Sequence, residues 1–216
     1  MKDICVVTDF DGTITVKDTL YNFFEDYAAE EWTKVEQYWT DGKISSKECL
    51  LQEFALVRNL SEKLVKSFLE NVEIDKYFKD FYDFVNSQNI DVYIVSDGVD
   101  YFIEAILKKF GVENIKVVSN HGEFKDNVFY LTFPNDNPHC LKDSGTCKCA
   151  VVNRLKNSYK KVIYIGDGVS DYCVADKADI VFAKKRLLEY CIKTSIPHIP
   201  YLNFNDLLNS DIFSQK

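Results

Sequence analysis

Three short apolar runs, each ending in small or acidic residues, constrain the fold of this chain most strongly. They are Lys2–Asp9, Ile90–Ser96 and Lys161–Gly166, and all three are rich in β-branched residues. Near-continuous apolar runs of this length are typical of parallel strands, because such strands are buried on both faces of their sheet. The sequence therefore predicts a parallel sheet whose strands end in polar residues.

Helical patterns fill the intervals between these runs. Aromatic and aliphatic residues recur at helical spacing in 77–85 and 101–110, and Asp179–Phe182 indicates a further short strand. Strands that alternate with helices predict an α/β fold with a Rossmann-like, doubly wound parallel sheet. The chain has 216 residues, of which 46% are hydrophobic. That length is sufficient for one core domain with an elaboration.

One long segment interrupts the alternation of strands and helices. Residues 17–73 have a helical and strongly aromatic pattern, with breaks at Asp41-Gly42 and at Asn59-Leu60-Ser61, where Ser61 is suited to cap a helix. We predict that this segment is an inserted α-helical cap. The core is then formed by residues 1–16 and 74–216.

A second interruption lies in the C-terminal half. The alternation from His121 to Leu131 predicts a hairpin, and a polar loop follows from Pro134 to Gly145. A zinc site is one interpretation of four residues in or near this loop, because thiols and imidazoles are typical zinc ligands: His139, Cys140, Cys147 and Cys149. We favour free thiols instead, because the seven cysteines are an odd number and show no paired Cys-x-x-Cys spacing.

Each predicted strand end supplies polar groups to the same edge of the sheet. The first ends at Asp9 and Asp11, the second at Ser96-Asp97-Gly98, and the third at Gly166-Asp167, four residues before Asp171. Lys148 falls on the helix that should precede the third strand. Ligands of open α/β sheets bind beyond the carboxyl ends of the strands, so these residues predict one site.

The chemistry of these groups indicates phosphoryl transfer. Crowded carboxylates repel one another and need a hard cation, and Mg²⁺ together with a substrate phosphate meets that need. Asp9 could then attack phosphorus as a nucleophile, while Asp11 protonates the leaving oxygen and later deprotonates water. The donors predicted to hold the phosphoryl oxygens are Ser96, the Gly98 amide and Lys148.

The same residues, in this order, resemble the four motifs of haloacid dehalogenase-type phosphatases. The motifs are Asp9-Phe10-Asp11-Gly12-Thr13, Ser96, Lys148, and Gly166-Asp167 with Asp171, and they span nearly the whole chain. The resemblance implies that Asp9 is the nucleophile and Asp11 the acid and base. It also implies magnesium ligation by Asp9, the Asp11 carbonyl and Asp167, with support from Asp171.

The predicted cap is similar to the small helical cap of the phosphoserine phosphatase branch. Within that branch, Ile14-Thr15, Gly145–Cys149 and His198–Tyr201 are most similar to the phosphatases of methionine salvage. Those enzymes act on 2-hydroxy-3-keto-5-methylthiopentenyl-1-phosphate, which is therefore the first expected substrate. Phosphoserine, and phosphoethanolamine or phosphocholine, are the alternatives, and a phosphate-sensing or metal-sensing pseudoenzyme is the non-enzymatic one.

The cap departs from the phosphoserine phosphatase pattern. The arginine that clamps the substrate carboxylate in that branch is replaced at Gln52-Glu53, although Arg58 is close in sequence. Asp18 could hold an amine, accept from a hydroxyl, or cap the first cap helix, and Phe24 could contribute to a lid that excludes water. The predicted specificity residues are Asp18, Phe24, Glu53 and Arg58.

Composition limits the partners and the location. The net charge is −8 and the basic residues are scattered, which argues against a broad nucleic-acid surface. No apolar run approaches the roughly 18 residues of a membrane span, and Met1–Asp9 leads directly into a strand, so we expect a cytoplasmic protein without a signal peptide. The expected partner is a small phosphorylated metabolite, and a monomer and a homodimer both fit the sequence.

Overall fold

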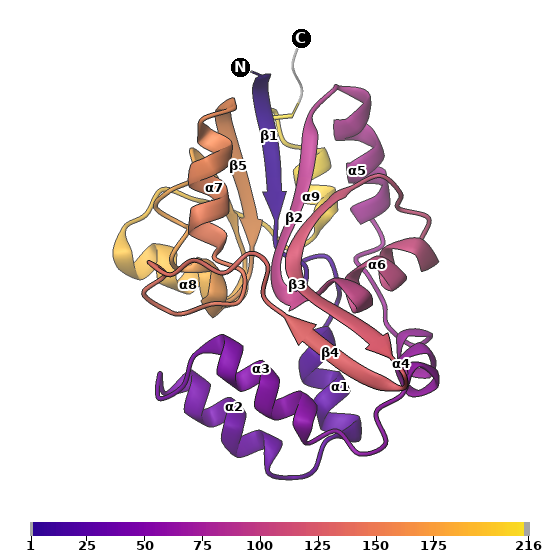
Figure 1. Ribbon diagram of the computed structural model, residues 1–216. Helices are drawn as coiled ribbons and strands as arrows, with labels where there is room; N and C mark the ends of the chain where they lie inside the picture. The colour runs from indigo at the N-terminus through magenta and orange to yellow at the C-terminus, as the bar shows by residue number, and fades with distance from the viewer. Residues whose placement is uncertain (1, 214–216) are drawn as a thin grey trace.

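The structure, a computed structural model that describes residues 2–213, contains one seven-stranded sheet in the order β4-β3-β2-β1-β5-β6-β7 (Figure 1). All neighbours pair in parallel except β3 and β4, which are antiparallel. The predicted doubly wound α/β fold is confirmed. The strands are β1 Lys2–Thr8, β2 Asp91–Val99, β3 Lys116–Lys125, β4 Val128–Thr132, β5 Tyr159–Gly166, β6 Ile180–Ala183 and β7 Ile199–Pro200.

Helices cover both faces of the sheet. Alternate residues of β1 belong to two different apolar clusters: Ile4 and Val6 pack with α5, α6 and α9, whereas Cys5 and Val7 pack with α7 and α8. Both faces of β1 are therefore buried, as a near-continuous apolar run requires. The helices of the core are α5 Phe78–Ser87, α6 Asp100–Lys109, α7 Lys148–Lys156, α8 Lys185–Thr194 and α9 Phe204–Leu208, with a short 3₁₀ turn at Val169–Asp171.

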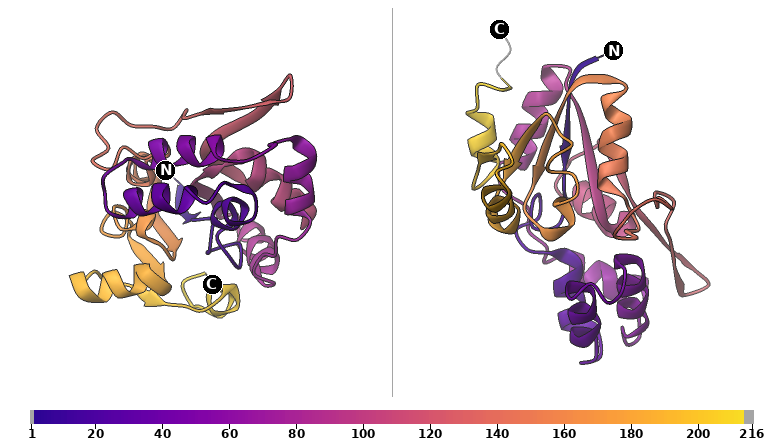
Figure 2. Two further views of the ribbon diagram at one scale, coloured as in Figure 1. Left: turned by 90° about the horizontal axis from the view of Figure 1, so that it is seen from below. Right: turned by 90° about the vertical axis from the view of Figure 1, so that its left-hand side faces the viewer.

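Four further helices lie beyond the carboxyl ends of the strands, on the side opposite the N-terminus (Figures 1 and 2). They are α1 Thr19–Tyr27, α2 Trp32–Thr40, α3 Ser46–Ala55 and α4 Glu62–Leu69. The Ser61 side chain accepts a hydrogen bond from the Leu64 amide, so the predicted cap of α4 is confirmed. The boundaries at residues 17 and 73 stay a prediction. No helix within residues 2–213 has both the length and the apolar character needed to cross a membrane.

Strand β2 differs from the expectation at its end. The polar residues Ser96-Asp97-Gly98 predict that the strand stops at Ser96, but it continues to Val99. A register shift between Val95 and Val99 interrupts the pairing with β3, and Val99 then pairs with Asn120. The irregularity bends the strand locally. Ser96 to Gly98 consequently belong to the strand but lie in the interval where its pairing with β3 is interrupted.

An aromatic cluster connects the helical cap to the core. The ring centroids of Phe23 on α1 and Phe102 on α6 are 5.2 Å apart, and those of Phe54 on α3 and Phe129 on β4 are 4.9 Å apart. The hairpin predicted around residues 121–131 is confirmed as β3–β4, and Phe129 on its second strand makes the contact with the cap. These contacts fix the cap above the ends of the strands.

Phe102→Ala should destabilise the protein by about 3–5 kcal/mol, because the ring is buried against Phe23 and Phe54 and its loss leaves a cavity. Chemical denaturation monitored by circular dichroism would measure this change. Phe102→Leu, which keeps most of the volume, should cost less than half as much. Equal unfolding midpoints for the alanine variant and the wild type would contradict the assigned packing.

Candidate active site

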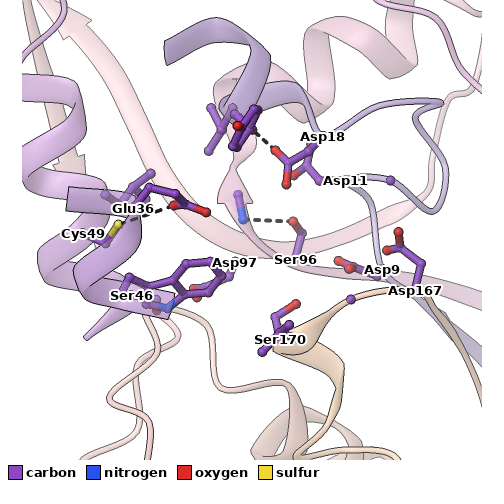
Figure 3. A pocket seen from close by; sticks show the side chains of 18 of the residues that line it. Asp9, Asp11, Asp18, Glu36, Ser46, Cys49, Ser96, Asp97, Asp167 and Ser170 are labelled. Carbon is purple, nitrogen blue, oxygen red and sulfur yellow. Dashed lines mark hydrogen bonds between the residues drawn. The ribbon is translucent and has the colours of Figure 1, made fainter. Parts of the chain in front are cut away.

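The three central strands bring polar side chains at their carboxyl ends to one point. β1 lies between β2 and β5, so Asp9 at the end of β1 has Ser96 on one side and Asp167 on the other (Figure 3). The Asp9 amide donates to the Ile165 carbonyl at 2.9 Å, which continues the sheet one residue past the end of β1. The Asp9 side chain is only 6% exposed and accepts from the Phe10 amide at 2.8 Å. The carboxylate is therefore nearly immobile.

A tight turn follows Asp9 and requires glycine at position 12. Gly12 has φ +71°, and a Cβ built there would lie 2.6 Å from Asp167 Oδ2. The Phe10 carbonyl accepts hydrogen bonds from the amides of Thr13, Ile14 and Thr15, which closes the turn. Any other residue at position 12 would combine backbone strain with a clash against the carboxylate.

Lys148 is a buried cation that joins two carboxylates. Its Nζ lies 2.7 Å from Asp9 Oδ1 and 2.6 Å from Asp171 Oδ1, and its side chain is 2% exposed. It also donates to Ser170 Oγ at 2.9 Å. Burial alone would lower the pKa of Lys148, but the charges of Asp171 and Asp9 outweigh burial and raise the pKa above its ordinary value. Lys148 is therefore charged whenever both carboxylates are ionised.

Asp171 is saturated with hydrogen-bond donors. Its Oδ1 accepts from Lys148 Nζ and from the Tyr164 hydroxyl at 2.5 Å, and its Oδ2 accepts from the amides of Asp167 and Gly168, each at 2.9 Å. Two donors on each oxygen occupy its normal accepting capacity. Asp171 therefore fixes the position of Lys148 and the course of the chain after β5. The sequence analysis did not identify Tyr164 as a residue of the site, because in the sequence it is only one residue of a predicted buried strand.

The three aspartates form a dense cluster of oxygen ligands. Asp9, Asp167 and Asp171 each offer a carboxylate oxygen, and these oxygens all lie within 4.8 Å of one another. Burial, and next the charge of Asp171, raise the pKa of Asp9 well above its ordinary value, although Lys148 opposes the shift. Ionised Asp9 thus needs more positive charge than Lys148 supplies. The donor set consists of carboxylate oxygens, which suit a hard divalent cation such as Mg²⁺.

Asp11 lies next to this cluster but in a different environment. Its Oδ1 accepts from the Thr19 amide at 3.0 Å, at the start of α1. Burial, and next the charge of Asp18, raise its pKa to about 7. A carboxyl group with that pKa can both donate and accept a proton near neutral pH. Its place between the sheet and the cap is the one expected for a group that serves a leaving oxygen.

Ser96 and Gly98 are held beside the same carboxylates. The Gly98 amide donates to Ser96 Oγ at 2.9 Å, and a Cβ at Gly98 would lie 2.8 Å from Asp11 Oδ2. Ser96 does not cap α6, because that helix begins after Val99 without a side-chain cap. The backbone at Gly98 can thus approach the site closely.

A cavity of about 470 Å³ separates this cluster from the cap helices. Asp9, Asp11, Asp167, Ser96 and Gly98 line its core side, whereas Lys148 and Asp171 do not line it and contact Asp9 and Asp167 from beneath. Of the predicted specificity residues, Asp18, Phe24 and Glu53 line the cavity. Arg58 is exposed and does not line it. Asp18 also caps α1, since it accepts from the Tyr21 amide at 2.9 Å.

Several residues of the cavity wall escaped the sequence analysis. Lys185 Nζ lies 2.9 Å from Asp167 Oδ2 and 3.0 Å from the Gly12 carbonyl, and Arg186 lines the cavity next to it. Lys185 and Arg186 follow the short strand at Ile180–Ala183. Their position after the carboxyl end of a strand could have identified them as residues of the site. Glu36 and Trp39 line the cavity from α2, and a helical pattern alone gives no indication of which face meets a substrate.

The cysteines near the polar loop are free thiols in the structure, as are all seven cysteines of the chain. Cys147 and Cys149 flank Lys148, and their sulfur atoms are 3.5 Å apart. Burial raises the pKa of the Cys147 thiol to about 11, which keeps it protonated at neutral pH. The two thiols accordingly pack around the first turn of α7 as neutral groups.

Comparison with known proteins establishes the family. Residues 6–176 match the haloacid dehalogenase-like hydrolase family. The chain belongs to that family. This result confirms the family predicted from the four motifs, and with it the prediction that the chain is a hydrolase.

Relatives of named activity match along nearly the whole chain. A Bacillus pumilus protein named 2-hydroxy-3-keto-5-methylthiopentenyl-1-phosphate phosphatase is 34% identical over 209 residues, which are 96% of this chain and 90% of the relative. A protein of the same name from Exiguobacterium is 29% identical over 204 residues, 94% of each chain. The resemblance to phosphatases of this name, predicted from the sequence, is confirmed.

Solved structures share the fold. A haloacid dehalogenase family hydrolase from Salmonella enterica serovar Typhi superposes with a TM-score of 0.74 at 16% identity, over 96% of this chain and 70% of the other. A phosphoserine phosphatase determined as a phospho-aspartyl intermediate analogue gives a TM-score of 0.69 at 18% identity, over 96% and 98%. The chain therefore shares its overall fold with these two proteins.

Lys148→Met should destabilise the protein by about 3–5 kcal/mol, because it leaves two buried carboxylates without their cation. Urea denaturation at neutral pH would measure the difference. Lys156→Met on the same helix is the matched control: its partner Asp179 is at the surface, so its loss should cost less than about 1 kcal/mol. Similar losses in the two variants would contradict the buried ion-pair assignment.

Proposed function

We propose that this protein is a Mg²⁺-dependent phosphatase that hydrolyses a small phosphomonoester through an aspartyl-phosphate on Asp9. The observation that supports this most directly is the buried Asp9 carboxylate, which lines the cavity together with a second carboxyl group, Asp11, whose pKa is about 7. A nucleophile and an acid–base group in one cavity are the requirements of a two-step displacement.

Asp9, the Asp11 carbonyl and Asp167 would hold the magnesium ion. When bound, the ion supplies the positive charge that keeps Asp9 ionised and that opposes the charge of the phosphoryl oxygens. Lys148 adds a second positive charge behind Asp9. Asp171 acts through its neighbours, because its four acceptor positions are already occupied by Lys148, Tyr164 and two amides.

In the first step, an Asp9 oxygen bonds to phosphorus as the bond between phosphorus and the leaving oxygen breaks. Asp11 gives its proton to that oxygen, and the product leaves as a neutral alcohol or enol. In the second step, Asp11 takes a proton from water, whose oxygen attacks phosphorus and frees both phosphate and Asp9. Ser96 and the Gly98 amide lie beside both carboxylates, where they would donate to the phosphoryl oxygens.

The substrate that we propose is 2-hydroxy-3-keto-5-methylthiopentenyl-1-phosphate. The support is the activity named for relatives that are 29–34% identical along nearly the full chain. The cavity lining agrees with an uncharged leaving group that has an apolar end, since Leu20, Phe24 and Leu50 contribute apolar surface. Phosphoserine is the second candidate, because the Arg186 guanidinium lines the cavity and could bind a carboxylate.

Asp9→Asn should lower the turnover number at least about a thousandfold, because an amide cannot act as the attacking oxygen nucleophile. The test is release of inorganic phosphate from the enol phosphate with Mg²⁺, and again after the ion is removed with a chelator. Asp3→Asn, at the exposed start of β1, is the control and should retain full activity. An Asp9→Asn variant that turns over normally would exclude this mechanism.

The substrate assignment has a separate test. We expect kcat/KM for the enol phosphate to exceed that for phosphoserine by at least about tenfold, because the acidic cap side of the cavity disfavours a carboxylate. We also expect it to exceed those for phosphoethanolamine and phosphocholine, because the relatives that match along nearly the whole chain are named for the enol phosphate. Steady-state kinetics on the four compounds would give the four values of kcat/KM and so their ranking. A preference for phosphoserine would instead assign Arg186 to carboxylate binding.

A further inference from the structure

Helix α3 presents unsatisfied oxygen atoms to the cavity. Glu53 lines the cavity, is 5% exposed, and its Oε1 has no hydrogen-bond partner within residues 2–213. Ser46 lies seven residues earlier, two helical turns away on the same face. Its buried Oγ lies beside the Asp97 carboxylate but forms no hydrogen bond of normal geometry in that part of the chain. A buried polar atom without a partner costs free energy. Two such atoms on one face of a cavity indicate a ligand that satisfies them.

A second carboxyl group adjoins Glu53 from the neighbouring helix. Glu36 on α2, Cys49 and Glu53 each offer an atom, and these atoms lie within 4.8 Å of one another. The Cys49 thiol donates to Glu36 Oε2 at 3.9 Å (Figure 3). Burial, and next the charge of Glu36, raise the pKa of Glu53 to about 8. The pair therefore retains one proton at neutral pH, as expected for two carboxyl groups that share a site.

A carboxyl pair with one proton is both a donor and an acceptor. It matches a ligand that carries a carbonyl oxygen beside a hydroxyl group, because the protonated member donates to the carbonyl while the ionised member accepts from the hydroxyl. A ligand carboxylate would be repelled by the ionised member. A ligand ammonium would be bound most strongly only after the shared proton had left.

The position of the pair fits the leaving group of a phosphate ester. Glu36 and Ser46 lie on the cap side of the cavity, away from Asp9 and Asp167 on the core side (Figure 3). Glu53 lines the same cavity from α3, the helix that carries Ser46. Leu50 lines the cavity between the turns that carry Ser46 and Glu53. A phosphoryl group at Asp9 would thus direct the rest of the substrate toward these three polar side chains.

We propose that Glu36 and Glu53, together with the Ser46 hydroxyl, form the subsite that binds the hydroxyl and keto oxygens of the leaving group. This inference rests on the proposed phosphatase function and assigns residues to its specificity. It makes Glu36 and Glu53 recognition groups that act without taking part in bond breaking. It also accounts for glutamate where the phosphoserine phosphatase pattern has an arginine.

The test compares two substrates in two variants. Dihydroxyacetone phosphate carries a hydroxyl and a keto oxygen, whereas phenyl phosphate has neither. Glu53→Leu should lower the ratio of kcat/KM for dihydroxyacetone phosphate to that for phenyl phosphate by about 10- to 100-fold, the loss of one or two buried hydrogen bonds. Glu53→Gln, whose amide still donates and accepts, should lower the ratio less than Glu53→Leu.

The pH dependence of the same ratio gives a second readout. The ratio should fall as pH rises through about 8, because the donor of the pair is then lost, and Glu53→Gln should abolish that fall. The groups that face the pair are Asp18 before α1, Cys49 on α3 and Arg186 on α8. The catalytic groups and the substrate phosphate titrate in the same way with phenyl phosphate as with dihydroxyacetone phosphate. Their pH dependence therefore cancels in the ratio, which reports only the interaction with the cap.

Glu48→Gln is the matched control on the same helix: Glu48 is exposed and contacts Gln52, so the ratio should stay at the wild-type value. Thermal unfolding of every variant verifies that the fold is intact. An unchanged ratio in folded Glu53→Leu would overturn the proposed subsite. A preference for phosphocholine that Glu53→Gln removes would replace it with a cation site. If the wild type released no phosphate from any compound, the proposed function itself would fail.

Discussion

The structure depends on one buried cation, the Lys148 ammonium, which lies between Asp9 and Asp171. Removing three charged groups from water is costly unless their charges and hydrogen bonds are matched. Here the match is nearly complete for Asp171, which accepts four hydrogen bonds, and incomplete for Asp9. The residual demand for positive charge at Asp9 is the physical reason that a divalent cation suits this site.

The cavity therefore has two ends with different chemistry. Its core end carries fixed carboxylates and amides at the ends of β1, β2 and β5, and these groups suit reactions at phosphorus. Its cap end carries Glu36, Ser46 and Glu53 among apolar side chains, and these groups suit recognition of the leaving group. Aromatic contacts such as Phe54–Phe129 join the cap to the core. Residues at the cap end can accordingly differ between proteins of this fold without a change in the groups at the core end.

The core and its motifs were predictable from the sequence because each depends on short-range patterns. Continuous apolar runs predict parallel strands, and the polar residues that end them, Asp9 and Asp167, must meet at one edge of the sheet. The continuation of β2 to Val99 was missed, because it depends on a register shift and on pairing with the distant Asn120. Glu36, Tyr164 and Lys185 were missed for a related reason. Their significance lies in which partner they face across the fold, and a local pattern contains no such information.

The central claim, covalent chemistry at Asp9, is tested most directly by chemical trapping. Borohydride reduces an acyl phosphate to an alcohol, so an enzyme quenched during turnover and then reduced should contain homoserine in place of Asp9. Peptide mass spectrometry would locate the change. This product is expected at Asp9 alone, and only when substrate and Mg²⁺ are both present. Reduction at another carboxylate, or an unmodified Asp9 during active turnover, would contradict it.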